Sequence, residues 1–380
     1  MTSRDHAEEP PSHAAAGGGV LPTGFDYALP PELIAQHPAA ERDGARLLVL
    51  DRAADGALTH SSIVDLPDWL RRGDLLVVNR SRVIPARLRA RRAGGGAVEL
   101  LLIAPVGDAD ASGPAPAGAR WMALVRPARR LREGQRVTLV RPKASGPEAA
   151  DESAVEVTIV RIEEGHAEIE LPSGVDPLAL LTRLGEPPLP PYIRRPDGAT
   201  HDDWVRYQTV FADEPGSIAA PTAGLHLSER LLAGLRAAGV EIAEVVLHVG
   251  PATFLAGRPG RAPLAVEPER YAIPAATRDL LLGAKGKRRI VAVGTTTTRA
   301  LESAARAGWP DGLQSTSLVL APGTRFAVVD ALLTNLHLPG SSLLALVSAF
   351  AGGEPMRRAY AAAVASRYRF YSYGDAMLIV

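Results

Sequence analysis

Hydrophobic and polar positions follow two different rhythms along the chain. From residue 205 onward, apolar runs of strand length alternate with stretches in which apolar residues recur at helical spacing. The expected strands are residues 241–250, 288–294, 315–323 and 376–380. The expected helices are residues 229–239, 276–286, 295–308, 341–352 and 355–368. This alternation predicts an α/β sheet covered by helices, in which ligands bind at the carboxyl ends of the strands.

A different pattern fills the segment from 85 to 175, where short apolar or alternating runs are separated by loops rich in Gly, Pro, Ala and Asp. The runs are residues 96–105, 120–127, 135–142, 154–162 and 166–171. Closely spaced strands with turn signals predict a small β-barrel. Before it, we expect strands at 45–52 and 73–88 and a short helix at 31–37.

The two patterns predict the domain organisation. We expect residues 21–84 and 176–380 to form an α/β catalytic domain, with residues 85–175 inserted as a β-barrel domain. Residues 1–20 are rich in Glu, Pro, Ala and Gly and contain no apolar core of the signal-peptide kind. We therefore expect them to form a disordered tail.

Composition narrows the possible chemistry. The 380 residues include no cysteine, which excludes disulfides, thiolate metal sites and cysteine nucleophiles and is typical of a reducing cytosol. No apolar run approaches the ~20 residues that span a bilayer. We expect a cytoplasmic protein without a membrane partner, and a monomer.

Charge is balanced overall but not locally. The 42 basic residues equal the 42 acidic residues, yet the segment from Arg82 to Lys143 carries a net charge of +9. A local basic field of this size attracts polyanions such as nucleic acids. The alternative is a solvated, arginine-rich face with no partner.

Three of the nine histidines, His226, His248 and His337, share one kind of setting: an apolar tripeptide beside turn residues. They could be a metal site, a catalytic cluster or buried core residues. Zinc is disfavoured, because the chain has no HExxH-type spacing and no neighbouring carboxylates to orient the ligands. Their position at expected strand or loop ends favours an active-site cleft. Imidazole can serve as acid or base there, and the sequence does not assign which histidine does which.

Two further stretches carry candidate binding residues. "AVGTTTTRALES" predicts a strand, a glycine turn and a helix N-terminus, where Gly294, Thr295 and Thr296 could bind a carboxylate or ribose hydroxyls. The alternatives are a threonine-rich cap without a ligand and, for Arg299, a structural ion pair. "SRYRFYSYGDAML" offers Tyr371 and Tyr373 as aromatic faces for a cation or a base, unless they belong to a core strand.

Several blocks together resemble one family. They include "GDLLVVNRSRVIPARL", "YQTVFADEPGSIAAPTAGLHL", "LHVGPATF", "AVGTTTTRALES", "TNLHLPGSSLLALVSAFAG" and "YRFYSYGDAMLIV". The chain resembles, from about residue 25 to 380, the S-adenosylmethionine:tRNA ribosyltransferase-isomerase family of queuosine biosynthesis.

The resemblance implies an α/β domain with an inserted β-barrel, S-adenosylmethionine as co-substrate, no metal, and the anticodon region of tRNA as partner. It further implies transfer of the ribosyl group to 7-aminomethyl-7-deazaguanine at the tRNA wobble position. The group becomes an epoxycyclopentanediol, giving epoxyqueuosine, while adenine and methionine leave. We expect His226, His248 and His337 to be the catalytic residues. The expected substrate-binding residues are Asn79, Arg82, Thr222, Gly224, Thr253, Gly294, Thr295, Thr296, Arg299, Asn335, Tyr371, Tyr373 and Asp375.

The chain also departs from the family pattern. Arg80 stands where the family usually has Asp, and "LAVEPE" at 264–269 keeps only Glu269 of a usual His-x-Met-His-x-Glu. Leu227 and Leu336 replace Phe, and Ala252 replaces Gly. These changes leave two alternatives open: a paralogue that uses the same donor on another acceptor, and a non-catalytic RNA-binding protein.

Overall fold

The structure is a computed structural model that describes residues 26–106, 118–141, 155–163, 165–251 and 267–380. The expected tail at 1–20, the predicted binding residue Thr253 and the substituted positions Ala252, Leu264 and Val266 lie outside these ranges.

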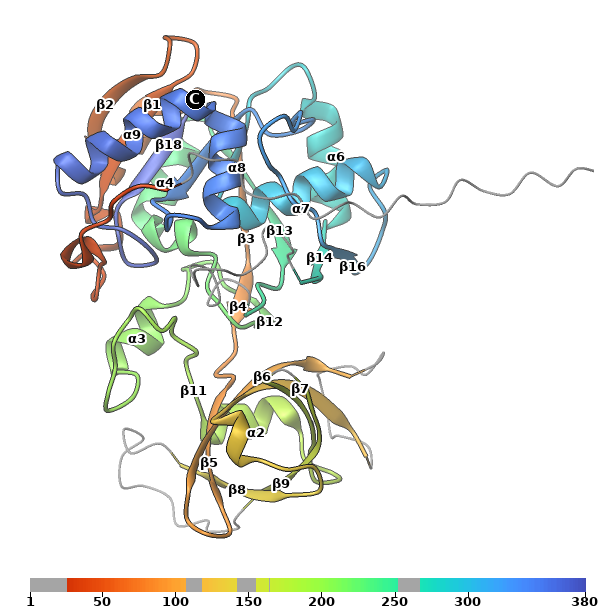
Figure 1. The fold of residues 1–380 in the computed structure, drawn as a ribbon. Helices are drawn as coiled ribbons and strands as arrows, with labels where there is room; N and C mark the ends of the chain where they lie inside the picture. Colours follow the sequence, from red (N-terminus) through yellow and green to blue (C-terminus); the bar gives the residue numbers. More distant parts are fainter. Residues whose placement is uncertain (1–25, 107–117, 142–154, 164, 252–266) are drawn as a thin grey trace, which may run out of the picture.

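The main layer is a mixed sheet whose described strands run in the order β16-β14-β13-β3-β15-β17-β18-β1-β2 (Figure 1). β13, β3, β15 and β17 are parallel neighbours, whereas β18 runs antiparallel to β17. The bounds are β1 (Arg46–Asp51), β2 (Ala57–Ser62), β3 (Leu75–Asn79), β13 (Glu241–Leu247), β14 (Glu269–Ala272), β15 (Ile290–Val293), β16 (Gln314–Thr316), β17 (Ala331–Asn335) and β18 (Ala376–Ile379).

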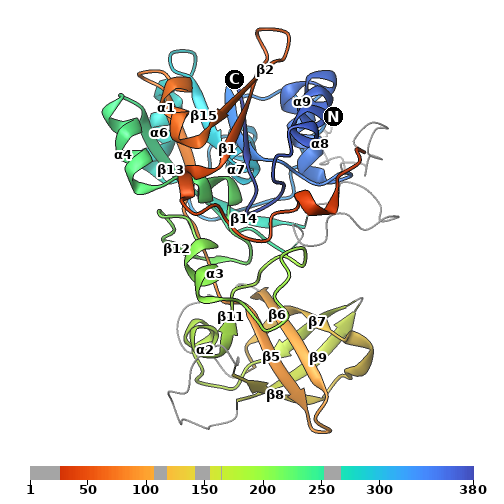
Figure 2. The ribbon, with the colours of Figure 1, turned by 90° about the vertical axis from the view of Figure 1, so that its left-hand side faces the viewer.

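Helices cover both faces of this sheet (Figures 1 and 2). One face packs against α6 (Ala275–Ala284), α7 (Thr295–Arg306), α8 (Ser342–Ala351) and α9 (Gly353–Ala365), and the other against α1 (Leu66–Trp69) and α4 (Glu229–Ala237). In β3, Val77 belongs to the first core and Leu76 to the second. Burial on both faces explains the nearly continuous apolar runs and confirms the predicted helix-covered α/β sheet.

The inserted barrel is also confirmed. Its strands close in the order β5-β6-β7-β10-β9-β8, and β8 pairs back to β5 with Leu139 opposite Ala90. Inward-facing side chains such as Leu88 and Ile159 fill its separate core. The bounds are β5 (Arg87–Arg92), β6 (Ala97–Pro105), β7 (Arg120–Arg126), β8 (Arg136–Val140), β9 (Glu156–Glu163) and β10 (His166–Glu170).

A neck joins the two parts. β4 (Ser81–Val83) leads toward the barrel and pairs in parallel with β12 (Glu214–Ser217) in a two-stranded sheet. The returning chain forms α2 (Pro177–Leu184), β11 (Gly185–Glu186) and α3 (His201–Arg206), then a 3-10 turn, η6 (Thr222–His226), beneath the sheet edge. The sequence analysis did not predict α2, α3 or strand β17.

Three element predictions were wrong. The expected strand at 73–88 is broken into β3, β4 and the start of β5, which belong to three different sheets. The expected helix at 31–37 is only the 3-10 turn η1 (Pro31–Leu33), because Ile34 extends to form a bridge with Phe370. The expected strand at 315–323 stops at Thr316, whose Oγ1 accepts a hydrogen bond from the backbone N–H of Leu318 (3.1 Å) and turns the chain out of the sheet.

Candidate active site

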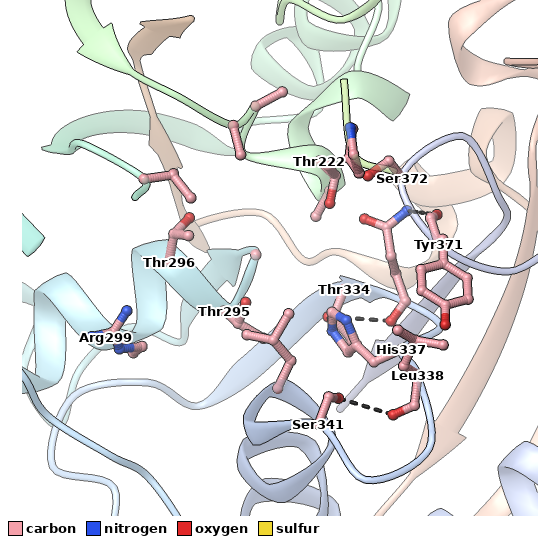
Figure 3. Close-up of a pocket in the computed structure, with 18 of the residues that line it drawn as sticks. Thr222, Thr295, Thr296, Arg299, Thr334, His337, Leu338, Ser341, Tyr371 and Ser372 are labelled. Atoms are coloured by element: carbon pink, nitrogen blue, oxygen red, sulfur yellow. Dashed lines mark hydrogen bonds between the residues drawn. The ribbon is translucent and has the colours of Figure 1, made fainter. Parts of the chain in front are cut away.

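A cavity opens where parallel strands end. β3 ends at Asn79, β13 at Leu247, β15 at Val293 and β17 at Asn335, and because these strands are parallel neighbours their carboxyl ends meet at one edge. Eight of the predicted site residues line the cavity (Figure 3): Thr222, Gly294, Thr295, Thr296, Arg299, Asn335, His337 and Tyr371. Unpredicted lining residues include Tyr192, Tyr207, Glu269, Thr334, Ser341 and Ser372.

The glycine turn at the start of α7 leaves two hydroxyls free of the helix. Gly294 has φ = 92°, in the left-handed region that favours glycine, and it is the N-cap residue of α7. The hydroxyls of Thr297 and Thr298 turn back to the carbonyls of Val293 (2.6 Å) and Gly294 (3.1 Å). Thr295 and Thr296 instead face the cavity, beside the positive end of the helix dipole. This corner of the cavity therefore suits an anionic or hydroxyl-bearing group.

Arg299 lies one turn further along α7 and forms a buried ion pair with Glu269 of β14. Its Nε donates to the carbonyl of Leu318 (3.0 Å), and Glu269 also accepts from the backbone N–H of Gly250 (2.8 Å). The Nη2 group of Arg299 is buried without a hydrogen-bond partner. The structural ion pair, which the sequence analysis gave as an alternative role for Arg299, is therefore present. The Nη2 group of Arg299 nevertheless remains available to a ligand.

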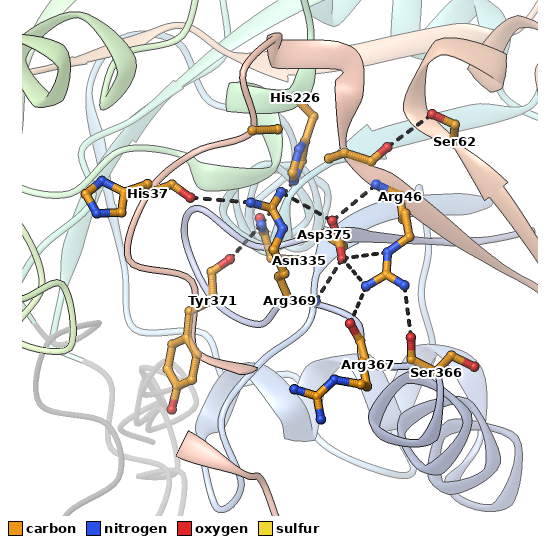
Figure 4. Close-up of polar contacts among 12 residues, drawn as sticks. His37, Arg46, Ser62, His226, Asn335, Ser366, Arg367, Arg369, Tyr371 and Asp375 are labelled. Atoms are coloured by element: carbon orange, nitrogen blue, oxygen red, sulfur yellow. Dashed lines mark hydrogen bonds and ion pairs between the residues drawn. The ribbon is translucent and has the colours of Figure 1, made fainter. Parts of the chain in front are cut away.

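Asn335 lines the cavity at the end of β17, and Figure 4 shows its polar contacts. Its Nδ2 lies 3.1 Å from Nε2 of His226 and donates to the carbonyl of Tyr371 (3.1 Å). Its Oδ1 is buried without a partner. Buried amide oxygens are usually hydrogen-bonded, so this atom is a candidate acceptor for a ligand.

His337 is the predicted histidine that lines the cavity. Its Nε2 lies 2.8 Å from Oγ1 of Thr334, and its backbone is held by the hydroxyls of Tyr360 and Tyr27. Burial lowers the pKa of His337 to about 4, so the imidazole is neutral at pH 7.

His226 lies behind the wall of the cavity. It ends η6 and reaches the cavity only through Asn335. Burial lowers its pKa to about 4, with Asp375 opposing this effect and Arg369 adding to it. His226 is therefore placed to orient Asn335 but does not contribute to the lining.

His248 does not line the cavity, although its neighbour Val249 does. Its Nδ1 is buried without a partner beside Gly216 of β12, where an added Cβ would come within 2.6 Å of that nitrogen. Burial, assisted by the charge of Arg270, lowers its pKa to about 4. The structure thus gathers one predicted histidine in the cavity and a second behind it, with the third toward the neck.

The remaining predicted residues lie outside the lining. Asn79 joins the ends of β3 and β13 through two hydrogen bonds with the backbone of Leu247 (2.9 and 3.0 Å). Tyr373 donates to Asp203 (3.0 Å). Asp375 binds Arg46 and the backbone N–H of Arg369 (Figure 4).

Two further predicted residues are also outside the cavity. Arg82 is exposed on β4 at the neck. Gly224 packs so closely under Phe211 that an added Cβ would come within 2.9 Å of the ring. Gly224 therefore has a packing role, whereas the side chain of Arg82 makes no hydrogen bond or ion pair with a described residue.

Comparisons with known proteins decide the family. A family model described as "Queuosine biosynthesis protein" matches residues 23–379. The chain belongs to the queuosine biosynthesis protein family. The resemblance drawn from the motifs is confirmed.

Relatives of this queuosine biosynthesis family cover nearly the whole chain. An S-adenosylmethionine:tRNA ribosyltransferase-isomerase from Sorangium cellulosum is 47% identical, over 93% of this chain and 97% of its own length. One from Thermus thermophilus is 46% identical, over 94% and 98%. The crystal structure of an S-adenosylmethionine tRNA ribosyltransferase from Thermotoga maritima is 34% identical with a TM-score of 0.51, covering 94% of this chain and all of that one. The curated relatives are named as enzymes.

Arg80, the charge reversal relative to the family pattern, has a local explanation. Its guanidinium lies 2.8 Å from Asp213, 3.8 Å from Glu214 and 4.0 Å from Glu244. It does not line the cavity. The reversed charge is therefore compensated at the neck, away from the uncommitted groups of Arg299 and Asn335.

Neither a metal cluster nor a membrane helix is found in the part of the chain that the structure describes. No three His, Cys, Asp or Glu side chains there are grouped so as to hold a metal ion. Similarly, no described helix is both long and apolar enough to cross a bilayer.

The buried histidines predict acid sensitivity of the fold. Because burial lowers the pKa values of His226 and His337 to about 4, the unfolded state binds more protons between pH 4 and the ordinary value of 6.5. The contribution of each histidine to the free energy of unfolding is fully present above about pH 6.5. It is lost as the pH falls toward 4, by up to about 3 kcal/mol for each group. Urea unfolding from pH 7 to 4.5 measures this slope.

The matched variants are His226→Gln and, as control, His201→Gln on the exposed surface of α3. We expect the first to flatten the pH dependence of the unfolding free energy and the second to leave it unchanged. Parallel curves for the wild type and His226→Gln would contradict a neutral, buried His226.

Proposed function

We propose that this chain transfers the ribosyl group of S-adenosylmethionine to 7-aminomethyl-7-deazaguanine at the wobble position of a tRNA. The ribose is isomerised to an epoxycyclopentanediol, giving epoxyqueuosine, and adenine and methionine are released. Family membership supports the reaction class, because the curated relatives are named for the donor and for tRNA.

One observation carries the assignment of the donor to this cavity: two of the residues that line it each hold a buried polar group without a partner. Arg299 offers a cationic N–H donor in the first turns of α7, and Asn335 offers a carbonyl oxygen at the end of β17. Burying such groups is costly unless a ligand satisfies them. A donor with a carboxylate at one end and hydroxyl or amino hydrogens at the other satisfies both.

The aromatic side of the cavity suits the sulfonium. Tyr192 and Tyr371 pack with their rings tilted by 45° and their centroids 4.3 Å apart, and both line the cavity. An aromatic face attracts a cation by ~0.5–2 kcal/mol. We assign Tyr371 to the sulfonium or to a base, Thr295 and Thr296 to the methionine carboxylate or the ribose, and Thr222 to the facing wall.

The chemistry requires two proton transfers. A base removes an acidified proton beside the sulfonium, and an acid protonates the departing adenine. We assign His337 to one of these transfers, because its neutral imidazole lines the cavity next to the hydroxyl of Thr334. His226 positions Asn335, and His248 lies on the side of the neck, from which the tRNA base would approach.

Calorimetric titration tests the donor assignment. We expect S-adenosylmethionine to bind with a dissociation constant below millimolar, whether tRNA is present or absent. The decarboxylated analogue should bind about 10- to 150-fold more weakly, since a hydrogen bond to a charged group is worth about 1.5–3 kcal/mol. Absence of binding at millimolar donor would overturn the proposed function, and equal affinities would remove the carboxylate from the corner at Arg299.

A further inference from the structure

Ten arginines of the barrel fall into two groups. Those in the first group lie on the barrel wall, and each has a carboxylate partner. The pairs are Arg87–Glu99 (3.8 Å), Arg89–Glu186 (2.6 Å), Arg120–Glu168 (3.4 Å), Arg136–Glu156 (3.6 Å) and Arg161–Glu163 (2.8 Å). Their charges are locally neutralised, so they add little to an external field.

The second group, which we call the barrel cap, consists of Arg91, Arg92, Arg129, Arg130 and Arg132. None of the five forms an ion pair with a described residue. The cap joins the β5–β6 hairpin to the β7–β8 connection, because Nη1 of Arg92 donates to the carbonyl of Arg130 (3.3 Å). Its neighbour Glu133 is occupied by the backbone N–H of Ile162 (3.2 Å). The cap therefore carries five positive charges, none of them paired with a described carboxylate, next to the single carboxylate of Glu133.

The position of the cap separates it from the active-site cavity. The β5–β6 turn lies at the end of the barrel that is turned away from the nine-stranded sheet (Figures 1 and 2). The cavity lies at the edge of that sheet. A ligand that touches both sites must be a macromolecule.

We propose that the barrel cap binds the phosphate backbone of the tRNA while the wobble base occupies the cavity. This inference rests on the proposed function and adds the surface that holds the tRNA outside its reacting nucleotide. Phosphates need only cations, whereas a protein partner needs an apolar interface core. None of the exposed large hydrophobic side chains among the described residues belongs to the cap, which favours RNA over an acidic protein.

The test measures binding of an unmodified full-length tRNA transcript by fluorescence anisotropy, from about 50 to about 200 mM salt. The variant is Arg129→Glu with Arg130→Glu, two exposed side chains without described contacts. Each lost phosphate contact lowers the salt slope by about one, so we expect the slope to fall by about two. The affinity at low salt should fall at least about tenfold.

The matched control is Arg161→Glu with Arg357→Glu, which changes the net charge equally. Both arginines are exposed and each is already paired with a glutamate. The inference predicts an unchanged salt slope for this control, and unchanged S-adenosylmethionine affinity for the cap variant. Equal effects of the two variants, or no effect of the cap variant, would overturn the cap as the tRNA site. A wild-type protein that binds no tRNA would instead overturn the proposed function.

Discussion

Replacing His337 with Gln lowers the rate of adenine release by about 10²- to 10⁴-fold, the usual cost of losing a positioned proton-transfer group. Glutamine keeps a polar group near Thr334 but cannot exchange a proton. The loop should remain in place, because the hydroxyls of Tyr360 and Tyr27 bind the backbone of residue 337 and not its ring. Single-turnover assays with precursor-bearing tRNA measure the chemical step.

The control for this prediction is His201→Gln, whose side chain is exposed on α3. Donor affinity, measured by calorimetry, should change less than about threefold in either variant, a difference well under 1 kcal/mol. A His337→Gln enzyme that keeps a rate within about threefold of the wild type would remove His337 from the chemistry.

The second large effect is expected at Arg299. Changing Arg299 to Met leaves the carboxylate of Glu269 buried and unpaired, and breaking a buried pair in this way costs about 3–5 kcal/mol of stability. The same variant loses the free Nη2 group, so it should no longer distinguish S-adenosylmethionine from its decarboxylated analogue. Urea unfolding and calorimetry measure the two effects separately.

The double variant Arg299→Met with Glu269→Gln separates structure from binding. Removing both charges should restore most of the stability, because no buried charge is left unpaired. Discrimination between the two donors should stay lost. If the stable double variant still prefers the carboxylate-bearing donor, the carboxylate binds elsewhere in the cavity.

Local patterns were sufficient to predict most of the fold. Alternating apolar runs identified the barrel strands, because burial on one face of a strand requires an apolar residue at every second position. Continuous apolar runs identified the covered sheet, because its strands are buried on both faces. β17 was missed because its five residues run straight into a turn segment. The strand expected at 315–323 ends early because the side chain of Thr316 accepts a hydrogen bond from the backbone N–H of Leu318, which apolar content does not reveal.

The candidate site was predictable where its signal was local. Gly294 with Thr295 and Thr296 combines a strand end, a positive-φ glycine and hydroxyls within three residues. Glu269 was noted only as the retained residue of a family motif, and its pairing with Arg299 was not predicted because the two lie 30 positions apart. His248 shows another limit of sequence analysis. It lies at a strand end as expected, but successive side chains point to opposite faces of a strand, and Val249 is the one that lines the cavity.

The most direct test of the central claim is the coupling of adenine release to tRNA modification. The purified protein is incubated with S-adenosylmethionine and precursor-bearing tRNA, and adenine, methionine and the modified nucleoside are quantified by chromatography. The account predicts equal amounts of all three, and no adenine when tRNA lacks the 7-aminomethyl-7-deazaguanine base. Adenine release that ignores this base, or none despite measured donor binding, would contradict it.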